Sequence, residues 1–444
     1  MTISNYVERL GRILDETAPA LAALDRYWSG DQPAAFLAPA AVEAMGNRLR
    51  SIAVNFPRVA VQSLAERLVV TGFRTDGPDE APDTDLWRIW RTNAMEEGAA
   101  QAHVDALVYG RAAVIVWAGR DARTPRITVE SARQVAAERD PGTGTVVAAL
   151  KRWTAAGRAH AVVYEPDVIR RYESVANVVE MGAIPLTGWR SVEEIANPLG
   201  VVPVVPVVNR GRLLDFDGVS EMADLLDLSD ALNKVLTDAL VTSEFFARPR
   251  RWVTGLEVIE DGAGEPVNPF SDELGRVWQA ESAETKFGQF AAAGVDGYSD
   301  LIATITQQIG AVSGLPPHYL GLHGDQPASA DAIRSAESSL VARAVARQRT
   351  FGQAWADVAR LVVAARDGVD PASVDIEVVW ANPETRTPAQ AADAAAKLVG
   401  VGVPLSVVLA DTLGMTPAQV ERVRIARRSD ALDGAGLDLS GLMA

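Results

Sequence analysis

The chain has 444 residues, of which 48% are hydrophobic, and its 58 acidic residues outnumber 42 basic ones, giving a formal net charge of −16. This composition is ample for a packed core, and the acidic excess argues against tight wrapping by nucleic acid, which needs clustered Lys and Arg. The absence of cysteine excludes disulfides, thiolate metal sites and cysteine nucleophiles, and the short, proline-broken apolar runs argue against membrane contact.

The N-terminal part of the chain is predicted to be helical. In "VNFPRVAVQSLAERLVVTGF" (54–73), apolar residues recur at steps of three and four. A second helix is expected over 85–110, with Asp83 or Thr84 as its cap and Gly110 as its stop.

The period then changes from helical to β-type. Short apolar runs divided by Gly, Pro and Asp predict strands at 111–118, 126–130, 145–153, 160–166 and 168–174. A further run, "VVPVVPVVN" at 201–209, contains two prolines and fits an edge strand.

A long amphipathic helix is predicted over 218–247, with "DFDG" (215–218) as its cap and an acidic polar surface that carries a lone Lys234. A compact β-like insert follows at 252–292, in which "RRWVTG" and "GRVWQA" are candidate strands. Helices over about 297–313 and 331–366, a strand at 375–381 and a small helical C-terminal region complete the pattern.

No motif for phosphate binding, zinc proteolysis or serine hydrolysis is present. His318 and His323 share a polar loop, but no cysteine or well-placed carboxylate completes a metal site around them. His103 and His160 fit ordinary packed or surface histidines. The sequence therefore predicts no catalytic, cofactor-binding or metal-binding residue.

The order of these elements resembles the portal proteins of tailed bacteriophages, particularly the portal family of long-tailed phages of Gram-positive hosts, from about residue 5 to 428. The most specific stretch is "GVSEMADLLDLSDALNKVLTDALVTSEFFARPRRWVTG", including Asp230, Asn233 and Pro249. The resemblance implies an α+β portal fold, mainly helical. Its expected parts are an N-terminal wing (1–212), a stem helix (213–247), a small β-containing clip (248–296), a second stem helix with a channel loop (297–330), a long wing helix (331–370) and a C-terminal strand with a helical crown (371–444).

The resemblance also implies a ring, usually a dodecamer, at one capsid vertex, through which double-stranded DNA is packaged and ejected without sequence specificity. The implied partners are the terminase large subunit, the major capsid and scaffolding proteins and a head–tail adaptor. The implied location is the virion, after assembly in the host cytoplasm. Another head–tail connector or minor capsid protein is the alternative from the same class. A soluble hydrolase that uses carboxylates or His318 and His323 is the alternative from a different class.

Two sets of site residues follow from the resemblance. The channel-loop candidates are Pro316, Pro317, His318, Gly321, His323, Gly324, Asp325, Gln326 and Ser329. The prolines are expected to end the preceding helix, and Ser329 or Asp331 to cap the next one. Without the resemblance, an ordinary loop between helices is the alternative.

The inter-subunit candidates are Arg334, Arg343, Arg347, Arg349, Asp224, Asp227 and Asp238. Arg343 and Arg347 are like-charged neighbours on one helix, an unfavourable pair on its own. A neighbouring subunit's acidic helix is therefore expected to pair with them, and solvated arginines are the alternative.

Overall fold

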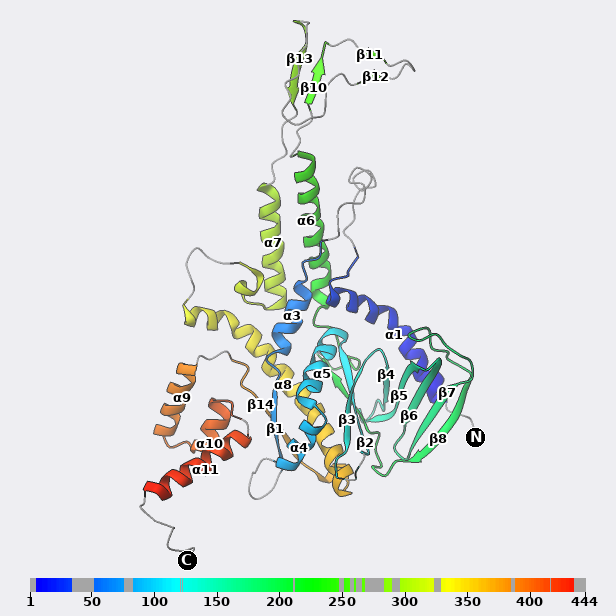
Figure 1. The fold of residues 1–444 in the computed structure, drawn as a ribbon, viewed down its shortest axis with the longest axis vertical. Coiled ribbons are helices and arrows are strands. Elements are labelled where there is room, and N and C mark those ends of the chain that lie inside the picture. The colour runs from blue at the N-terminus through cyan, green and yellow to red at the C-terminus, as the bar shows by residue number, and fades with distance from the viewer. Residues whose placement is uncertain are drawn as a thin grey trace, which may run out of the picture. The chain divides into compact units, whose positions relative to one another are not determined.

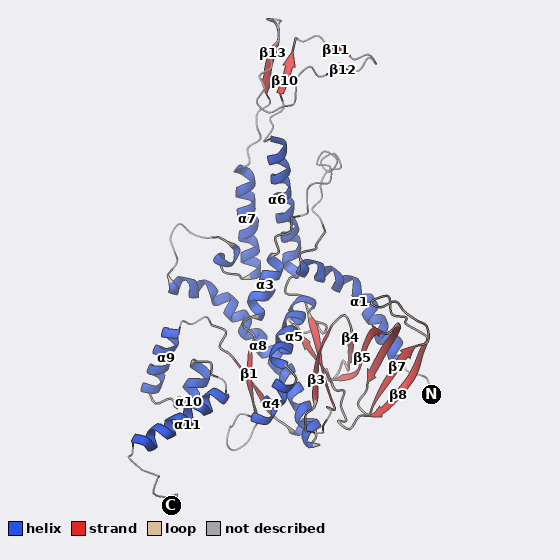
Figure 2. Cartoon of the chain, in the orientation of Figure 1, coloured by secondary structure: helices blue, strands red, loops and turns tan. Residues whose placement is uncertain are grey.

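The computed structural model describes residues 5–33, 52–75, 83–119, 121, 123–210, 212–246, 251–255, 259–260, 266–267, 283–289, 296–322, 329–384, 388–415 and 417–434. The fold is α+β, as predicted (Figures 1 and 2). The chain divides into two compact units. Unit 1 comprises Met1–Gln32, Asn55–Asp227 and Ile309–Ala444, and unit 2 comprises Pro33–Val54 and Leu228–Gln308.

The main core of unit 1 forms around a three-stranded antiparallel sheet in the order β3-β2-β9. Helices α5 and α8 pack on β2, and Trp90, Phe351 and Trp355 are almost completely buried in this core. The elements that build it are α3 (Phe56–Ala65), α4 (Thr84–Thr92), α5 (Met95–Tyr109), β2 (Arg111–Trp117), β3 (Arg126–Ser131), β9 (Val204–Val208) and α8 (Ala330–Asp367).

Several local predictions for this core are confirmed. The Asp83 carboxylate accepts a hydrogen bond from the Leu86 amide at 2.8 Å and caps α4. Gly110 ends α5 in the left-handed conformation, with φ 88°. The single helix predicted over 85–110 is wrong, because α4 ends at Thr92 and α5 begins at Met95 after Ala94, which is left-handed with φ 54°. Strand β9, which contains Pro206, lies at the edge of its sheet, where a residue that cannot donate a ladder hydrogen bond is tolerated.

The predicted helix over 54–73 is wrong in its second half. Helix α3 ends at Ala65, and Val70–Thr75 forms strand β1, which pairs antiparallel with β14 (Ile376–Trp380). The side chains of Val70 and Phe73, both on β1, are buried. Pairing with a strand far downstream therefore overrides the local helical spacing.

The second sheet of unit 1 has five antiparallel strands, and helix α1 (Asn5–Ser29) packs on it through Leu10 and Leu14. In sheet order, its strands are β4 (Val135–Arg139), β5 (Val146–Ala155), β6 (Arg158–Tyr164), β7 (Val168–Ser174) and β8 (Trp189–Ala196). Strands β5, β6 and β7 match the predicted runs, whereas β4 and β8 were not predicted.

Unit 2 contains most of two helices, α6 (Leu226–Phe246) and α7 (Asp296–Ser313), which run alongside each other (Figure 1). The Thr242 and Tyr298 hydroxyl oxygens lie 3.0 Å apart between them. The chain between these helices includes two strand pairs, β10 (Arg251–Thr254) with β13 (Lys286–Gln289) and β11 (Ile259–Glu260) with β12 (Pro266–Val267). The candidate strand "RRWVTG" is thus present in part, and "GRVWQA" lies outside the described residues.

The first of these helices starts later than predicted. A 3-10 turn, η1 (Ala223–Leu225), precedes α6, which begins at Leu226 instead of residue 218. "DFDG" is not a helix cap, because the Gly218 amide donates to the Asp215 carbonyl oxygen in a turn and the Asp217 carboxylate pairs with Arg111 at 2.9 Å.

The C-terminal part is helical, as expected. It follows β14 and contains α9 (Pro388–Gly400), α10 (Leu405–Val407), a π-helical turn (Val408–Thr412) and α11 (Pro417–Gly434). Gly402, which follows α9, and Gly414, which follows the π-helical turn, both adopt positive φ.

Candidate functional site

The N-terminal half of α8 binds both chain segments that connect unit 1 to unit 2. The incoming segment runs from Asn209 at the end of β9 to Asp227, and the outgoing segment runs from Ile309 through the predicted channel loop. Both segments and α8 belong to unit 1.

The incoming segment is held by a buried carboxylate, Glu221, whose side chain is only 5% exposed. Arg343 forms an ion pair with one of its carboxylate oxygens, and Arg347 Nη2 lies 3.0 Å from the other. Burial alone would raise the pKa of Glu221, but the two guanidinium groups hold that pKa below its usual range. Glu221 is therefore an ionised anchor between two turns of α8 and the incoming segment.

Backbone contacts hold the same segment against α5. The Glu221 amide donates to the Leu107 carbonyl oxygen at 2.8 Å. Asn209 Nδ2 donates to the Val219 carbonyl oxygen at 2.7 Å and to Glu221 Oε2 at 3.1 Å. Hydrogen bonds thus join the two ends of the stretch between Asn209 and Val219.

Two glycines meet where this segment passes the end of α5. Gly110 and Gly218 have φ values of 88° and 75°, and a Cβ on Gly218 would lie 2.0 Å from the Gly110 carbonyl oxygen. At both positions the backbone is left-handed and leaves no room for a Cβ, so glycine is required.

We expect Gly218→Ala to lower the free energy of unfolding by roughly 2 kcal/mol, because the methyl group would push two backbone segments apart. Gly157→Ala is the matched control, since Gly157 has a φ of 74° and nothing within 4 Å of its added Cβ. In that control, the free energy of unfolding should fall only by the cost of holding alanine in the left-handed conformation, about 1 kcal/mol. Equal losses in urea unfolding of the two variants would contradict the close approach of Gly110 and Gly218.

Within the outgoing segment, α7 ends at Ser313. Gly314 follows with φ 65°, Leu315 is buried, and Pro317–Leu320 forms a short 3-10 helix closed by Gly321. The helix therefore ends before Pro316 and Pro317, so Gly314 occupies the stop position that was predicted for the prolines. At the far end, the Ser329 hydroxyl accepts a hydrogen bond from the Ala332 amide at 3.2 Å and caps α8.

A second buried carboxylate, Glu337 of α8, holds this turn. Arg67 Nη2 lies 3.2 Å from Glu337 Oε1, in a pair whose side chains are 11% and 7% exposed. The same guanidinium donates to the Tyr319 hydroxyl at 3.2 Å, and that hydroxyl donates to Glu337 Oε1 at 3.5 Å. His318 Nε2 lies 3.8 Å from the same carboxylate oxygen.

Arg343 links the two segments. Arg343 pairs with Glu221 and also lies close to the Gly314 backbone. A Cβ added to Gly314 would lie 3.2 Å from Arg343 Nη1 and 2.8 Å from Ser339 Oγ. The outgoing backbone therefore packs directly on the side chain that holds the incoming segment. The arrangement fixes both segments on one stretch of α8.

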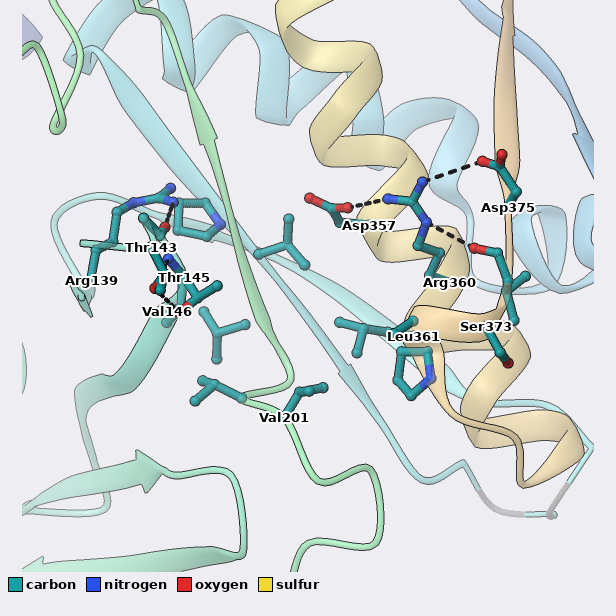
Figure 3. Close-up of a pocket in the computed structure, with 18 residues that line it drawn as sticks. Arg139, Thr143, Thr145, Val146, Val201, Asp357, Arg360, Leu361, Ser373 and Asp375 are labelled. Atoms are coloured by element: carbon teal, nitrogen blue, oxygen red, sulfur yellow. Dashed lines mark hydrogen bonds and ion pairs between the residues drawn. The ribbon is translucent and has the colours of Figure 1, made fainter. Parts of the chain in front are cut away.

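A groove of about 780 Å³ lies elsewhere in unit 1, beside β9 and the C-terminal half of α8 (Figure 3). Arg360 donates to Asp357 Oδ1 at 2.6 Å and to the Val374 carbonyl oxygen at 3.0 Å, and Arg139 donates to the Gly144 carbonyl oxygen at 3.0 Å. These contacts hold the chain after α8 and the β4–β5 turn in place, which is a structural role.

Over the described ranges, no group of three or more His, Asp or Glu side chains is placed to hold a metal ion. In that same part of the chain, no helix has the length and apolar character that crossing a membrane requires.

Residues 8–421 match the model of one protein family, described as phage portal protein, SPP1 Gp6-like. The chain belongs to this portal protein family. The portal protein of Mycobacterium phage D29 is 34% identical over 403 residues, which cover 86% of this chain and 80% of that one. The portal protein of Mycobacterium phage L5 is 34% identical over 405 residues, covering 88% and 81%.

Two solved structures are more distant. One, described as the virion of a native gene transfer agent particle, has 15% identity and a TM-score of 0.46, covering 87% of this portal protein and 94% of that chain. The other, the neck of a native particle of that kind computed with C12 symmetry, has 14% identity and a TM-score of 0.46, covering 86% and 95%. Neither assigns a role to any residue here.

The structure brings some of the predicted site residues together. Pro316, Pro317, His318 and Gly321 lie in the folded turn and Ser329 caps α8, whereas His323, Gly324, Asp325 and Gln326 lie outside the described residues. Arg334, Arg349, Asp224 and Asp227 are exposed, and Asp238 pairs with Lys234 one turn earlier on α6.

Arg343 and Arg347 need a correction. They were expected to require a neighbouring subunit's acid, because they are like-charged neighbours on α8. Glu221 of the same chain already lies between them. The reason for expecting an external partner is therefore removed.

Glu337 and Arg67 are absent from the predicted set. A signal existed for Glu337, because it lies one turn before Leu340 on the buried stripe of α8. A carboxylate on such a stripe needs a buried partner. Arg67 carries no comparable local signal, since it follows α3 in a short turn.

Proposed function

We propose that this portal protein assembles into a closed ring, a dodecamer, at one vertex of the capsid. The ring forms the channel through which double-stranded DNA is packaged and ejected, and it is the platform for the terminase large subunit and the head–tail adaptor. The observation that carries this proposal is the family match over residues 8–421. Major capsid and scaffolding proteins are the other proposed partners, with assembly in the host cytoplasm and final location in the virion.

The proposed channel loop runs from Ser313 to Ser329 and acts mechanically. Its two ends are anchored on α8, through Tyr319 beside Glu337 at one end and through the Ser329 cap at the other. Residues 323–328 lie between these anchors. A tether with two fixed ends suits a segment that contacts moving DNA while its base stays in place.

The exposed residues Arg334, Arg349, Asp224 and Asp227 remain proposed inter-subunit contacts. Exposed side chains of both signs suit a heterologous ring interface, in which each subunit presents different surfaces to its two neighbours. Simple solvation of these side chains is the alternative, and such surface pairs contribute little energy.

The proposal is tested by shortening the loop. We expect deletion of Gly324–Gln326 to leave rings intact in electron micrographs but to reduce DNA packaging strongly, because the loop loses reach while its anchors and the core are unchanged. The matched control is His318→Gln with His323→Gln, which keeps loop length and should package DNA nearly normally.

Normal packaging by the shortened protein would remove the mechanical role of the loop. Loss of packaging in the double Gln variant, with rings still present, would instead assign chemistry to the histidines. Protein that stays monomeric over a wide range of concentration and salt would contradict the ring itself.

A further inference from the structure

Helix α11 carries the most basic short stretch within the described part of this acidic chain. Residues 422–428, "RVRIARR", contain four arginines and no acid, a net charge of +4, in a chain of net charge −16. Arg424, Arg427 and Arg428 have the spacing i, i+3 and i+4, which places them on one side of the helix. Arg422 lies on a different side.

Two acids flank these arginines on α11, Glu421 three residues before Arg424 and Asp430 three residues after Arg427. Every residue from 424 to 431 is exposed. Arg424 lies 3.7 Å from Glu421 in a pair whose side chains are 65% and 57% exposed, and such pairs contribute little. Arg427 and Arg428 form no ion pair with a described residue. Like charges at this spacing destabilise an isolated helix, so the cluster suits an external anion.

We infer that the Arg424–Arg427–Arg428 face of α11 binds the phosphate backbone of double-stranded DNA. The inference rests on the proposed passage of double-stranded DNA through the ring, and it assigns a DNA contact outside the channel loop, whose predicted residues lie far away in sequence. Guanidinium groups bind phosphate oxygens in a bidentate manner, and they do so without reading base sequence.

The spacing of the three arginines fits the phosphates of one DNA strand. They span about 6 Å of helix axis, at roughly 1.5 Å per residue. One DNA strand presents a phosphate charge about every 3.4 Å along its axis, so the face can engage two or three phosphates of one strand.

The test compares two triple variants of the full chain for binding to a fluorescently labelled 30-base-pair duplex at several salt concentrations, by anisotropy. The first is Arg424→Gln, Arg427→Gln and Arg428→Gln, which keeps helix propensity because Gln and Arg are similar helix formers. The matched control, Arg88→Gln, Arg171→Gln and Arg190→Gln, removes three exposed arginines of unit 1 elsewhere. Both variants therefore have the same net charge.

We expect the α11 variant to bind the duplex at least about tenfold more weakly at low salt. The slope of log K against log salt should fall by about 2 to 3, since each lost phosphate contact contributes about 0.9. The control should change the slope by less than about 1. Circular dichroism checks that α11 still folds.

Two results would overturn the inference. Equal weakening by both triple variants would show that net charge, and not this face, attracts DNA. Loss of rings in the α11 variant with unchanged DNA affinity per subunit would assign the face to a neighbouring copy of the chain. Rings that form normally while DNA binding falls would support the inference and leave the ring proposal intact.

Discussion

Replacement of Glu221 by Gln is expected to lower the free energy of unfolding by about 3 kcal/mol, because it leaves two partly buried guanidinium groups without their shared counter-charge. Arg343 and Arg347 are 29% and 19% exposed, so water screens them in part and the loss should stay near the lower end of the range for broken buried pairs. Urea unfolding followed by tryptophan fluorescence measures the loss.

The pH dependence of this effect has a definite sign. The folded-state pKa of Glu221 is lowered, by Arg347 and Arg343 acting against burial. Its stabilisation is therefore present above the unfolded pKa of about 4.3 and is lost as pH falls through the lower folded value. The difference between the wild type and Glu221→Gln should shrink as pH falls below about 4.

A surface glutamate provides the control. Glu377 is 67% exposed and lies 3.5 Å from Arg74, so Glu377→Gln should change stability by less than about 0.5 kcal/mol. If Glu221→Gln cost no more than this control, Glu221 would not be an anchor, and the attachment of the incoming segment would rest on its backbone contacts alone.

Features set by a few adjacent residues could be predicted from the sequence. The Asp83 cap, the Gly110 stop and the edge position of β9 each follow from one residue type in a local setting. The bounds of α8 were predicted within a residue or two, because its apolar stripe is long and continuous.

Features set by distant partners could not be predicted in the same way. Strand β1 has helical spacing in its own sequence and becomes a strand only because β14 pairs with it. Strand β8 is exposed along most of its length and lacks an alternating apolar pattern. Its Glu193 and Glu194 instead pair with Arg171 and Arg170 of β7.

The same limit applied to the site. In the sequence, Glu221 resembles one more acid on the polar surface of a helix, because it precedes Asp224 and Asp227 at helical spacing. Its role depends on Arg343 and Arg347, more than a hundred residues downstream. Only the tertiary fold distinguishes this buried carboxylate from the exposed ones beside it.

Acidification is expected to destabilise unit 1 through His103. This ring is fully buried, accepts a hydrogen bond at Nε2 from Trp355 Nε1 at 2.8 Å, and stacks on Phe351 at 5.3 Å. Burial lowers its pKa to about 3, against about 6.5 in the unfolded chain. Between these values the unfolded chain binds a proton that the folded chain does not.

Stability should therefore fall as pH drops below 6.5, by roughly 1.4 kcal/mol per unit and by about 2 kcal/mol at pH 5. The Glu221 effect changes only below about pH 4.3, so between pH 5 and 6.5 the slope reports His103 alone of the two. His103→Gln keeps an acceptor for Trp355 but cannot take up a proton, and it should remove most of the slope between pH 5 and 6.5.

His160→Gln, at a half-buried ring stacked on Trp153 at 5.5 Å, is the control and should retain the slope. Urea unfolding at pH 5, 6, 7 and 8 decides the matter: an undiminished slope in His103→Gln would place the acid sensitivity of this core elsewhere.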